Sequence, residues 1–297
     1  NRFLCREKFT GYDLYLENSK ELNLVGGSAS VDDSVLDKPY SNPEHAVFID
    51  YFWSGKHHKV VKGINLITLF YVDVTGKCLP INFRIYDKRQ NKTKNDHFRE
   101  MLAEVLLWGL QPAIVTGDAW YSGLKNLKHI RKNELDFLFG IEIDRQVSIE
   151  KGSYIRVDQI DDFPSNGRVV YLKEFGNVRV FRQIFKNTYR YYIMGVAKLD
   201  NLELITHDIF RKAHANHWLI ETYHRAIKQV CNIEKFQVRN TRAIRNHIFC
   251  AIRAFCKLEI MKTKQMIVNW YQIKRNLFNE IIASFIKDQG IQLLLNA

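Results

Sequence analysis

The chain has 297 residues, of which 46% are hydrophobic, so it can bury one large core or two smaller ones. No apolar run approaches the roughly 18 residues that cross a bilayer, and the five cysteines, odd in number and without a Cys-x-x-Cys pair, do not indicate a disulfide framework. The thiols are expected to be reduced, as in a cytoplasmic protein, and a net charge of +12 with a pI near 9.4 suits a polyanion such as nucleic acid.

Residues 1–44 carry little periodic pattern. They contain loop signals at residues 26–30 and 41–43, and three scattered acids, Asp32, Asp33 and Asp37. We interpret this segment as a lead-in to the folded core. Because the chain begins at Asn1 without methionine, we expect its start to be truncated.

The next hundred or so residues predict a mixed sheet flanked by helices. Three strands are expected at residues 46–52, 65–74 and 78–86, the last two forming a hairpin. An amphipathic helix, a strand, a second helix and a further strand follow, at residues 95–110, 113–118, near 122–133 and 137–142. The order β-β-β-α-β-α-β places this chain in the α/β class.

Two changes in the pattern of hydrophobic and polar residues divide the rest of the chain. Residues 145–204 alternate β-branched and aromatic residues with polar ones, which predicts an inserted β-rich subdomain. The chain is then helical, with residues 205–262 returning to the core that residues 45–144 began and residues 263–297 forming a C-terminal helical tail. From Arg211 onward the chain contains 15 Lys and Arg residues and 5 Asp and Glu residues, a net charge of +10. This part of the chain is therefore the most basic.

Three carboxylates lie in contexts typical of a catalytic site. Asp50 ends one apolar run, Asp118 ends another, and Glu221 lies on a basic helix with His224 and Lys228 on the same stripe. Each acid also has an ordinary structural interpretation: Asp50 as a turn residue, Asp118 as a helix N-cap, and Glu221 as an ion-pair partner one turn from a cation. The combination favours a site for cations.

The run 116–121, Thr-Gly-Asp-Ala-Trp-Tyr, the run 218–221, Trp-Leu-Ile-Glu, and the Glu-x6-Lys spacing from Glu221 to Lys228 resemble the insertion-sequence transposases of the DDE class. The resemblance extends over roughly residues 46–260. It implies an RNase H-like core in which Asp50, Asp118 and Glu221 are the three catalytic acids. The Tyr and Arg positions of this group's Tyr-x2-Arg-x3-Glu-x6-Lys signature hold His214 and His217 instead.

The resemblance also implies a metal-dependent reaction on DNA. Two Mg²⁺ ions, or Mn²⁺, would be held by Asp50, Asp118 and Glu221, since these cations prefer oxygen ligands. DNA at the element ends and at the target would be the substrate, a second copy of the chain the partner, and the bacterial cytoplasm or nucleoid the location. Seven residues are predicted to contact DNA: Lys228, His217, His214, Arg225, Arg239, Arg242 and Trp120. Charged His217 would replace the phosphate-binding arginine, so cleavage would weaken as pH rises from about 7 to 8.5.

Several alternatives remain open at this point. His207, His214, His217 and His224 could form a zinc site, although no cysteine pair accompanies them. Trp120 could pack in the core rather than stack on a base. The chain could be an inactive, transposase-derived DNA-binding protein, or a nuclease on the same fold that cuts without joining.

Overall fold

A computed structural model describes residues 2–150, 152–197 and 199–287 of the chain. Within these residues, eleven strands form one mixed sheet. The strands are β1 Ser28–Asp37, β2 Asp50–Ser54, β3 Lys59–Val72, β4 Cys78–Tyr86, β5 Ile114–Gly117, β6 Asp136–Ile141, β7 Gln146–Ser148, β8 Tyr154–Arg156, β9 Arg168–Leu172, β10 Gly176–Phe185 and β11 Thr188–Gly195.

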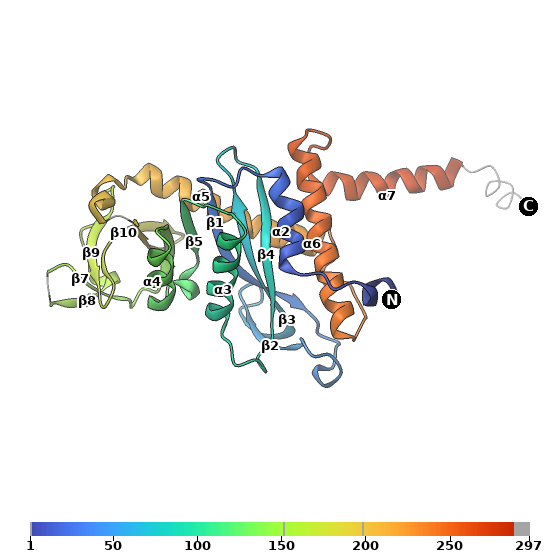
Figure 1. Cartoon of the computed structure of the whole chain (residues 1–297), viewed down its shortest axis with the longest axis horizontal. Coiled ribbons are helices and arrows are strands. Elements are labelled where there is room, and N and C mark those ends of the chain that lie inside the picture. Colours follow the sequence, from blue (N-terminus) through green and yellow to red (C-terminus); the bar gives the residue numbers. More distant parts are fainter. Residues whose placement is uncertain (1, 151, 198, 288–297) are drawn as a thin grey trace, which may run out of the picture.

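Seven α-helices accompany the sheet within the same ranges (Figure 1). They are α1 Arg2–Arg6, α2 Gly11–Asn18, α3 Lys94–Leu107, α4 Leu124–Lys132, α5 His207–Gln229, α6 Thr241–Thr263 and α7 Trp270–Lys287. Short 3-10 helices are η1 Ser19–Glu21, η2 Pro43–His45, η3 Ala119–Tyr121, η4 Val157–Gln159 and η5 Leu199–Leu204. None of these described helices has the length and apolarity needed to cross a membrane.

The strand β1 lies at the centre of the part of the sheet that the sequence predicted. It pairs antiparallel with β3 and parallel with β5; β4 extends the sheet beyond β3, and β6 beyond β5. The long apolar strand β3 is buried along most of its length, as a strand covered on both faces requires. The expected strands at 65–74, 78–86, 113–118 and 137–142 correspond to β3, β4, β5 and β6, and the expected helices to α3 and α4.

The segment 1–44 departs most from expectation. Far from being only a lead-in, it supplies α2 and the central strand β1. Asp50 was expected on the first strand of the core, but it begins β2, a five-residue strand that pairs with β3 alone. The first core strand is therefore β1, and its two central acids, Asp32 and Asp33, enter the middle of the sheet.

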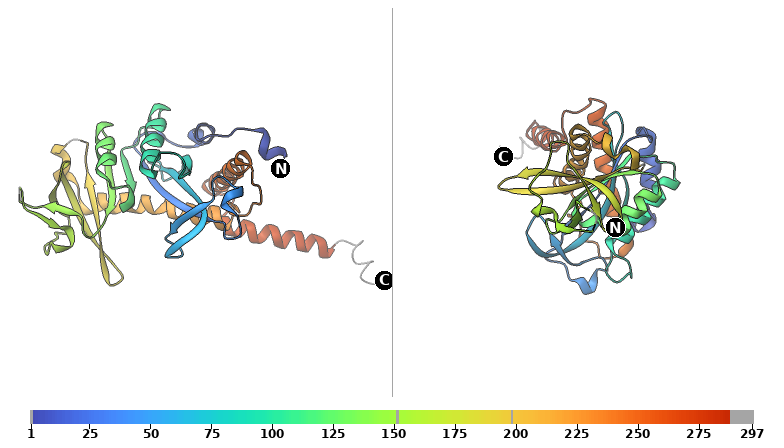
Figure 2. Two further views of the ribbon diagram at one scale, coloured as in Figure 1. Left: turned by 90° about the horizontal axis from the view of Figure 1, so that it is seen from below. Right: turned by 90° about the vertical axis from the view of Figure 1, so that its left-hand side faces the viewer.

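Helices cover both faces of the sheet around β1. Asp32 faces α5, where it lies near His224, and Asp33 faces α3, where it pairs with Lys94. Since successive side chains of a strand point to opposite faces, α5 and α3 lie on opposite sides of β1. Figure 2 shows this arrangement, with α5 passing along one side of the strands and α3 lying on the other.

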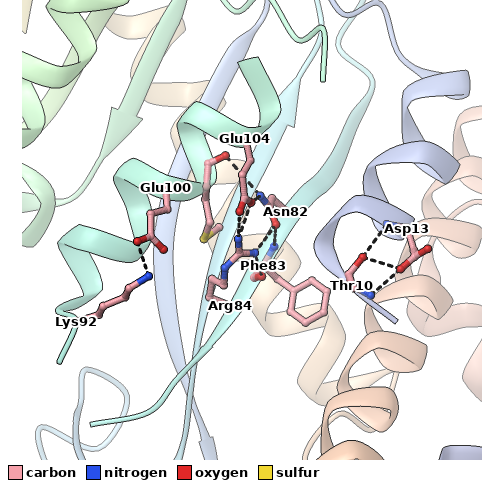
Figure 3. Close-up of polar contacts among 9 residues, drawn as sticks. Thr10, Asp13, Asn82, Phe83, Arg84, Lys92, Glu100 and Glu104 are labelled. Atoms are coloured by element: carbon pink, nitrogen blue, oxygen red, sulfur yellow. Dashed lines mark hydrogen bonds and ion pairs between the residues drawn. The ribbon is translucent and has the colours of Figure 1, made fainter. Parts of the chain in front are cut away.

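Polar contacts fix α3 against β4 and so position the start of the helix (Figure 3). Arg84 and Asn82 of β4 both bond to the carboxylate of Glu104. At its other end, α3 begins after the N-cap Thr93, whose side chain accepts a hydrogen bond from the backbone of Asp96 while the Asp96 carboxylate bonds back. The helix therefore presents its first residue, Lys94, to β1 in a fixed position.

The predicted β-rich insertion is present as strands β7 to β11. They do not form a separate sheet: β11 pairs antiparallel with β6, so the insertion continues the core sheet outward through β10, β9 and β7 to β8. After β11 the chain returns as α5, which packs against β1 and β5. In Figure 1 the last helix, α7, runs away from the body of the molecule.

Candidate active site

Asp32 is a buried carboxylate in the middle of β1. Its residue is 8% exposed, and its Oδ1 accepts a 2.7 Å hydrogen bond from the backbone N–H of Asp33. Its Oδ2 lies 3.4 Å from Nδ1 of His224 on α5. Burial, followed by the charges of Glu221 and Asp33, raises the pKa of Asp32 well above its usual range. Negative charge is thus concentrated here without a cation in ion-pair contact with Asp32 among the described residues.

Glu221 and His224 approach Asp32 from α5. The helix begins after Thr206, whose side chain caps the N–H of Ile209, and it buries an apolar face against the sheet. That docking brings one potential ligand atom from each of Asp32, Glu221 and His224 within 4.8 Å of one another. Ligand atoms about 2.1 Å from an Mg²⁺ ion lie up to roughly 4.2 Å apart, so a small adjustment would let this group bind a cation.

Asp118 joins the site from the neighbouring strand. β1 and β5 are parallel, with Val31 opposite Gly117, so the residues that follow, Asp32 and Asp118, are neighbours. Packing by surrounding protein, and then the charges of Asp32 and Asp33, raise the pKa of Asp118 to about 7. Because Asp118 is exposed at the surface, repulsion from the two aspartates is the better supported cause of its raised pKa.

The carboxylate of Asp118 also has a local structural role. It accepts a 3.0 Å hydrogen bond from the backbone N–H of Trp120 and caps η3. The N-cap interpretation of this acid and the catalytic one are therefore compatible, because one hydrogen bond leaves further lone pairs of the carboxylate free.

Asp33, the other acid at the centre of β1, is fully engaged on the opposite face. Its carboxylate accepts hydrogen bonds from Asn65 at 2.6 Å, Lys94 at 2.7 Å and the hydroxyl of Tyr121 at 2.9 Å. Burial and the nearby acids, first Asp33, raise the pKa of the Tyr121 phenol, which keeps it a hydrogen-bond donor. These contacts make Asp33 an anchor between β1, α3 and η3.

The structure does not bring Asp50 to this cluster. Asp50 pairs with Gly63 of β3, whereas Asp32 pairs with Thr68, five residues farther along that strand. At about 3.3 Å per residue, this separation is about 17 Å along the sheet. The Asp50 carboxylate lies 3.4 Å from Lys88 and caps its own strand end through Tyr51 N–H. The placement is thus corrected: Asp32, not Asp50, lies beside Glu221 and Asp118.

Two polar side chains of α5, His217 and Lys228, contact the sheet. Nδ1 of His217 lies 3.3 Å from Oγ1 of Thr116 on β5, and Nζ of Lys228 donates a 2.8 Å hydrogen bond to the carbonyl of Val35 on β1. Burial, followed by the charges of His214 and His224, lowers the pKa of His217 to about 4. The expected charged clamp is therefore corrected: His217 is neutral above pH 7 and packs on the sheet.

The remaining predicted DNA contacts are dispersed over the surface. His214 bonds to the hydroxyl of Tyr192 at 3.1 Å, while Arg225, Arg239 and Arg242 are exposed. Trp120 is 61% exposed beside the acids, not packed in the core. The ammonium of Lys94 lies over the Trp120 ring, 4.5 Å from its centroid. An aromatic face therefore lies next to the carboxylates.

The four-histidine zinc alternative finds no support in the geometry. Among the described residues, the metal-compatible group with at least three ligands contains a single histidine, His224, beside two carboxylates. Sequence reasoning did not assign Asp32 or Lys94 to the site, and it named His224 only on the stripe of Glu221 and in the zinc alternative. The available signal was the pair of valines, Val31 and Val35, that flanks Asp32 and Asp33, since β-branched residues are enriched in strands.

Comparison with solved structures supports the fold. A cryo-EM structure of the piggyBac transposase synaptic complex with hairpin DNA aligns with a TM-score of 0.50 and 14% identity, over 89% of this chain and 54% of that chain. The chain thus spans about half the length of that transposase. The Drosophila P element transposase strand transfer complex aligns at 9% identity over 97% and 79% of the two chains, with a TM-score of 0.25 too low to support an inference. No curated protein is significantly similar in sequence.

The sequence also matches a protein family described as "Transposase DDE domain", over residues 31–256. The matched region begins on β1, one residue before Asp32, and includes Asp118 and Glu221. The resemblance found in the sequence and its RNase H-like fold are confirmed by this match and by the structural alignment. The chain belongs to the transposase DDE domain family.

Proposed function

We propose that the chain cleaves DNA strands and joins them to a target, using Asp32, Asp118 and Glu221 as its three catalytic acids. The convergence of these carboxylates on one point of the sheet is the observation that carries the proposal. Asp32 and Asp118 come from paired parallel strands and Glu221 from the helix packed across them. Burial, and then the charges of neighbouring acids, raise the pKa of both aspartates, and a divalent cation would offset the repulsion among these acids.

The three acids would hold two Mg²⁺ or Mn²⁺ ions. Asp32 lies between the other two acids and would be shared, while Asp118 and Glu221 would each hold one ion. When bound, such a pair of cations stabilises charge on the attacking and leaving oxygens of a phosphodiester. In cleavage, water attacks phosphorus and the bond to the 3′ oxygen breaks; in joining, that 3′ hydroxyl attacks a target phosphodiester and displaces the target's own 3′ oxygen.

Other residues of the site would orient the DNA rather than react with it. Trp120 lies on the exposed side of the carboxylates and offers an aromatic face to an incoming strand, while Lys94, which pairs with Asp33, lies over its ring. The exposed arginines Arg225, Arg239 and Arg242 would contact phosphates farther along the duplex. A second copy of the chain on paired DNA ends, and action in the bacterial cytoplasm or nucleoid, remain part of this proposal.

Replacing Asp32 and Asp50 separately by asparagine tests the assignment. Asp32→Asn should lower strand cleavage by at least about 10³-fold, because the shared acid is lost, while Asp50→Asn should keep cleavage within about threefold of the unaltered chain. Both variants should bind DNA normally in EDTA. The assignment fails if Asp32→Asn cleaves at the unaltered rate, or if Asp50→Asn is the inactive variant.

One DNA substrate can separate the competing functions in the same assay. Cleaved strands that become joined to a target identify a transposase, whereas cleavage without joining identifies a nuclease. DNA binding without either reaction, in Mg²⁺ and in Mn²⁺, identifies an inactive DNA-binding derivative.

A further inference from the structure

His224 is the residue of the cluster that the proposed chemistry does not yet use. It lies one turn after Glu221 on α5, is 5% exposed, and faces Asp32 across 3.4 Å through Nδ1. Its other ring nitrogen, Nε2, is buried and has no hydrogen-bond partner in the described part of the structure. A buried histidine of this kind can either bind a cation directly or hold the carboxylate beside it.

The two ring nitrogens decide between these roles. If Nδ1 bound a cation, the proton of the neutral ring would lie on Nε2, where a buried N–H would have no acceptor. Metal-bound histidines almost always donate that second N–H to a carboxylate, a carbonyl or water. If Nδ1 instead carries the proton and donates it to Asp32, Nε2 is left with only a lone pair. An unsatisfied acceptor is tolerated more readily than an unsatisfied donor.

Neighbouring contacts support the second arrangement. His224 is 5% exposed, and Nε2 has no partner in the described part of the structure, so a ring with its single N–H on Nδ1 fits the site. On the other side, Oδ1 of Asp32 already accepts the N–H of Asp33. A donor on each oxygen would fix the plane of the Asp32 carboxylate, leaving the remaining lone pairs of both oxygens for cations.

We propose that His224 is a positioning residue, which donates its Nδ1–H to Oδ2 of Asp32 and holds that carboxylate in the orientation needed to share cations with Glu221. This inference rests on the proposed metal site. Lys228, one turn farther along α5, fixes the same helix to the backbone of β1 through the carbonyl of Val35. His224 and Lys228 together therefore set the distance between the helix that carries Glu221 and the strand that carries Asp32.

Three substitutions of His224 distinguish positioning from ligation and from simple packing. Asparagine can place an amide donor near the position of Nδ1, glutamine reaches toward the position of Nε2, and leucine fills the space without a donor. Binding of Mg²⁺ and of Mn²⁺ to the full chain is measured by titration calorimetry without DNA. His97→Leu is the matched control, because His97 is also buried, 4% exposed and without partners for its ring nitrogens, but lies on α3.

We expect His224→Leu and His224→Gln to weaken the binding of both cations by about 10-fold or more, and by the same factor. His224→Asn should restore affinity to within about threefold, and His97→Leu should leave it unchanged. A larger loss for Mn²⁺ than for Mg²⁺ in His224→Asn would show that the imidazole is a ligand, because nitrogen ligands favour the transition metal.

Unchanged affinity in all three variants, with the fold intact by circular dichroism, would overturn the inference. Should His224→Leu fail to fold, the contrast between His224→Asn and His224→Gln still decides it. Cation binding that follows the expected pattern without any strand cleavage would refute the proposed activity and leave the role of His224 standing.

Discussion

The acids of the site differ in the hydrogen-bond donors and charges that surround them. Asp33 accepts hydrogen bonds from Asn65, Tyr121 and the cation Lys94, whereas Asp32 and Asp118 face each other and Glu221 with few cations nearby. Two aspartates of the same cluster thus have opposite roles: one ties the strand to its neighbours, and the other retains unbalanced charge. In a metal-free protein, unbalanced charge of this kind opposes folding.

Asp118 therefore gives the metal-free protein a pH-dependent stability. Its folded-state pKa is raised to about 7 from an ordinary value near 3.8, so the folded state binds more protons than the unfolded state between these values. Its contribution to the free energy of unfolding falls as pH rises from about 4 to 7 and stays low above that. The groups that face it are Asp32, Asp33 and Lys94.

Asp118→Asn should remove this dependence. At pH 8 in EDTA we expect the variant to be more stable than the unaltered chain by about 1–2 kcal/mol, less than the full shift would give because the residue keeps solvent access. At pH 4 the difference should vanish. Denaturant unfolding at the two pH values checks this, and equal stability at pH 8 would contradict it.

His217 should respond to substitution as a packed residue. His217→Arg would place a guanidinium against Thr116, where the neutral imidazole now lies. We expect a loss of about 1–3 kcal/mol of stability and no gain of cleavage between pH 7 and 8.5. Cleavage and thermal unfolding of the two proteins measure this. A rise in alkaline activity in the variant would show that the side chain reaches DNA instead.

At the scale of elements, the hairpin of β10 and β11 stands out from the rest of the sheet. Residues 183–190 at its tip are all exposed, and residues 176–195 contain four cations and no acid. The register places Arg182 with Tyr189 on one face and Arg190 with Phe185 on the other, and each guanidinium lies over its ring, at 4.7 Å and 3.5 Å. A two-stranded ribbon of this kind fits the major groove of DNA.

Neutralising the tip should therefore weaken DNA binding. In EDTA, the double variant Lys186→Ala, Arg190→Ala should bind DNA less tightly, and the slope of log affinity against log salt should fall by about two units, one per lost phosphate contact. The double variant Lys20→Ala, Lys257→Ala removes the same charge from exposed positions elsewhere and serves as the control. Equal salt slopes in the two variants would show that the tip of the hairpin does not contact DNA.

At the scale of the whole molecule, the insertion and the core form one continuous sheet. β11 pairs with β6, and the chain then crosses back as α5 to deliver Glu221 beside β1. The position of Glu221 thus depends on the core strands β1 and β5, which precede the insertion, and on α5, which follows it. This explains how an acid 103 positions after Asp118 in the sequence meets it in space: the return helix packs on the same two strands from which Asp32 and Asp118 project.

Much of the regular structure of the core could be predicted from the sequence alone, as could two of the acids that the proposed site uses, Asp118 and Glu221. Hydrophobic periodicity located β3, β4, β5 and β6 because their faces are buried by apolar contacts, and Asp118 and Glu221 lay in recognisable local patterns. The tertiary structure alone decided that β1 is the central strand. Its polar residues are satisfied by partners distant in sequence: Ser30 bonds to Thr116, and Asp33 to Asn65, Lys94 and Tyr121. No local pattern encodes such contacts, so the polar residues of β1 outweighed the weak strand signal of its valines in the sequence.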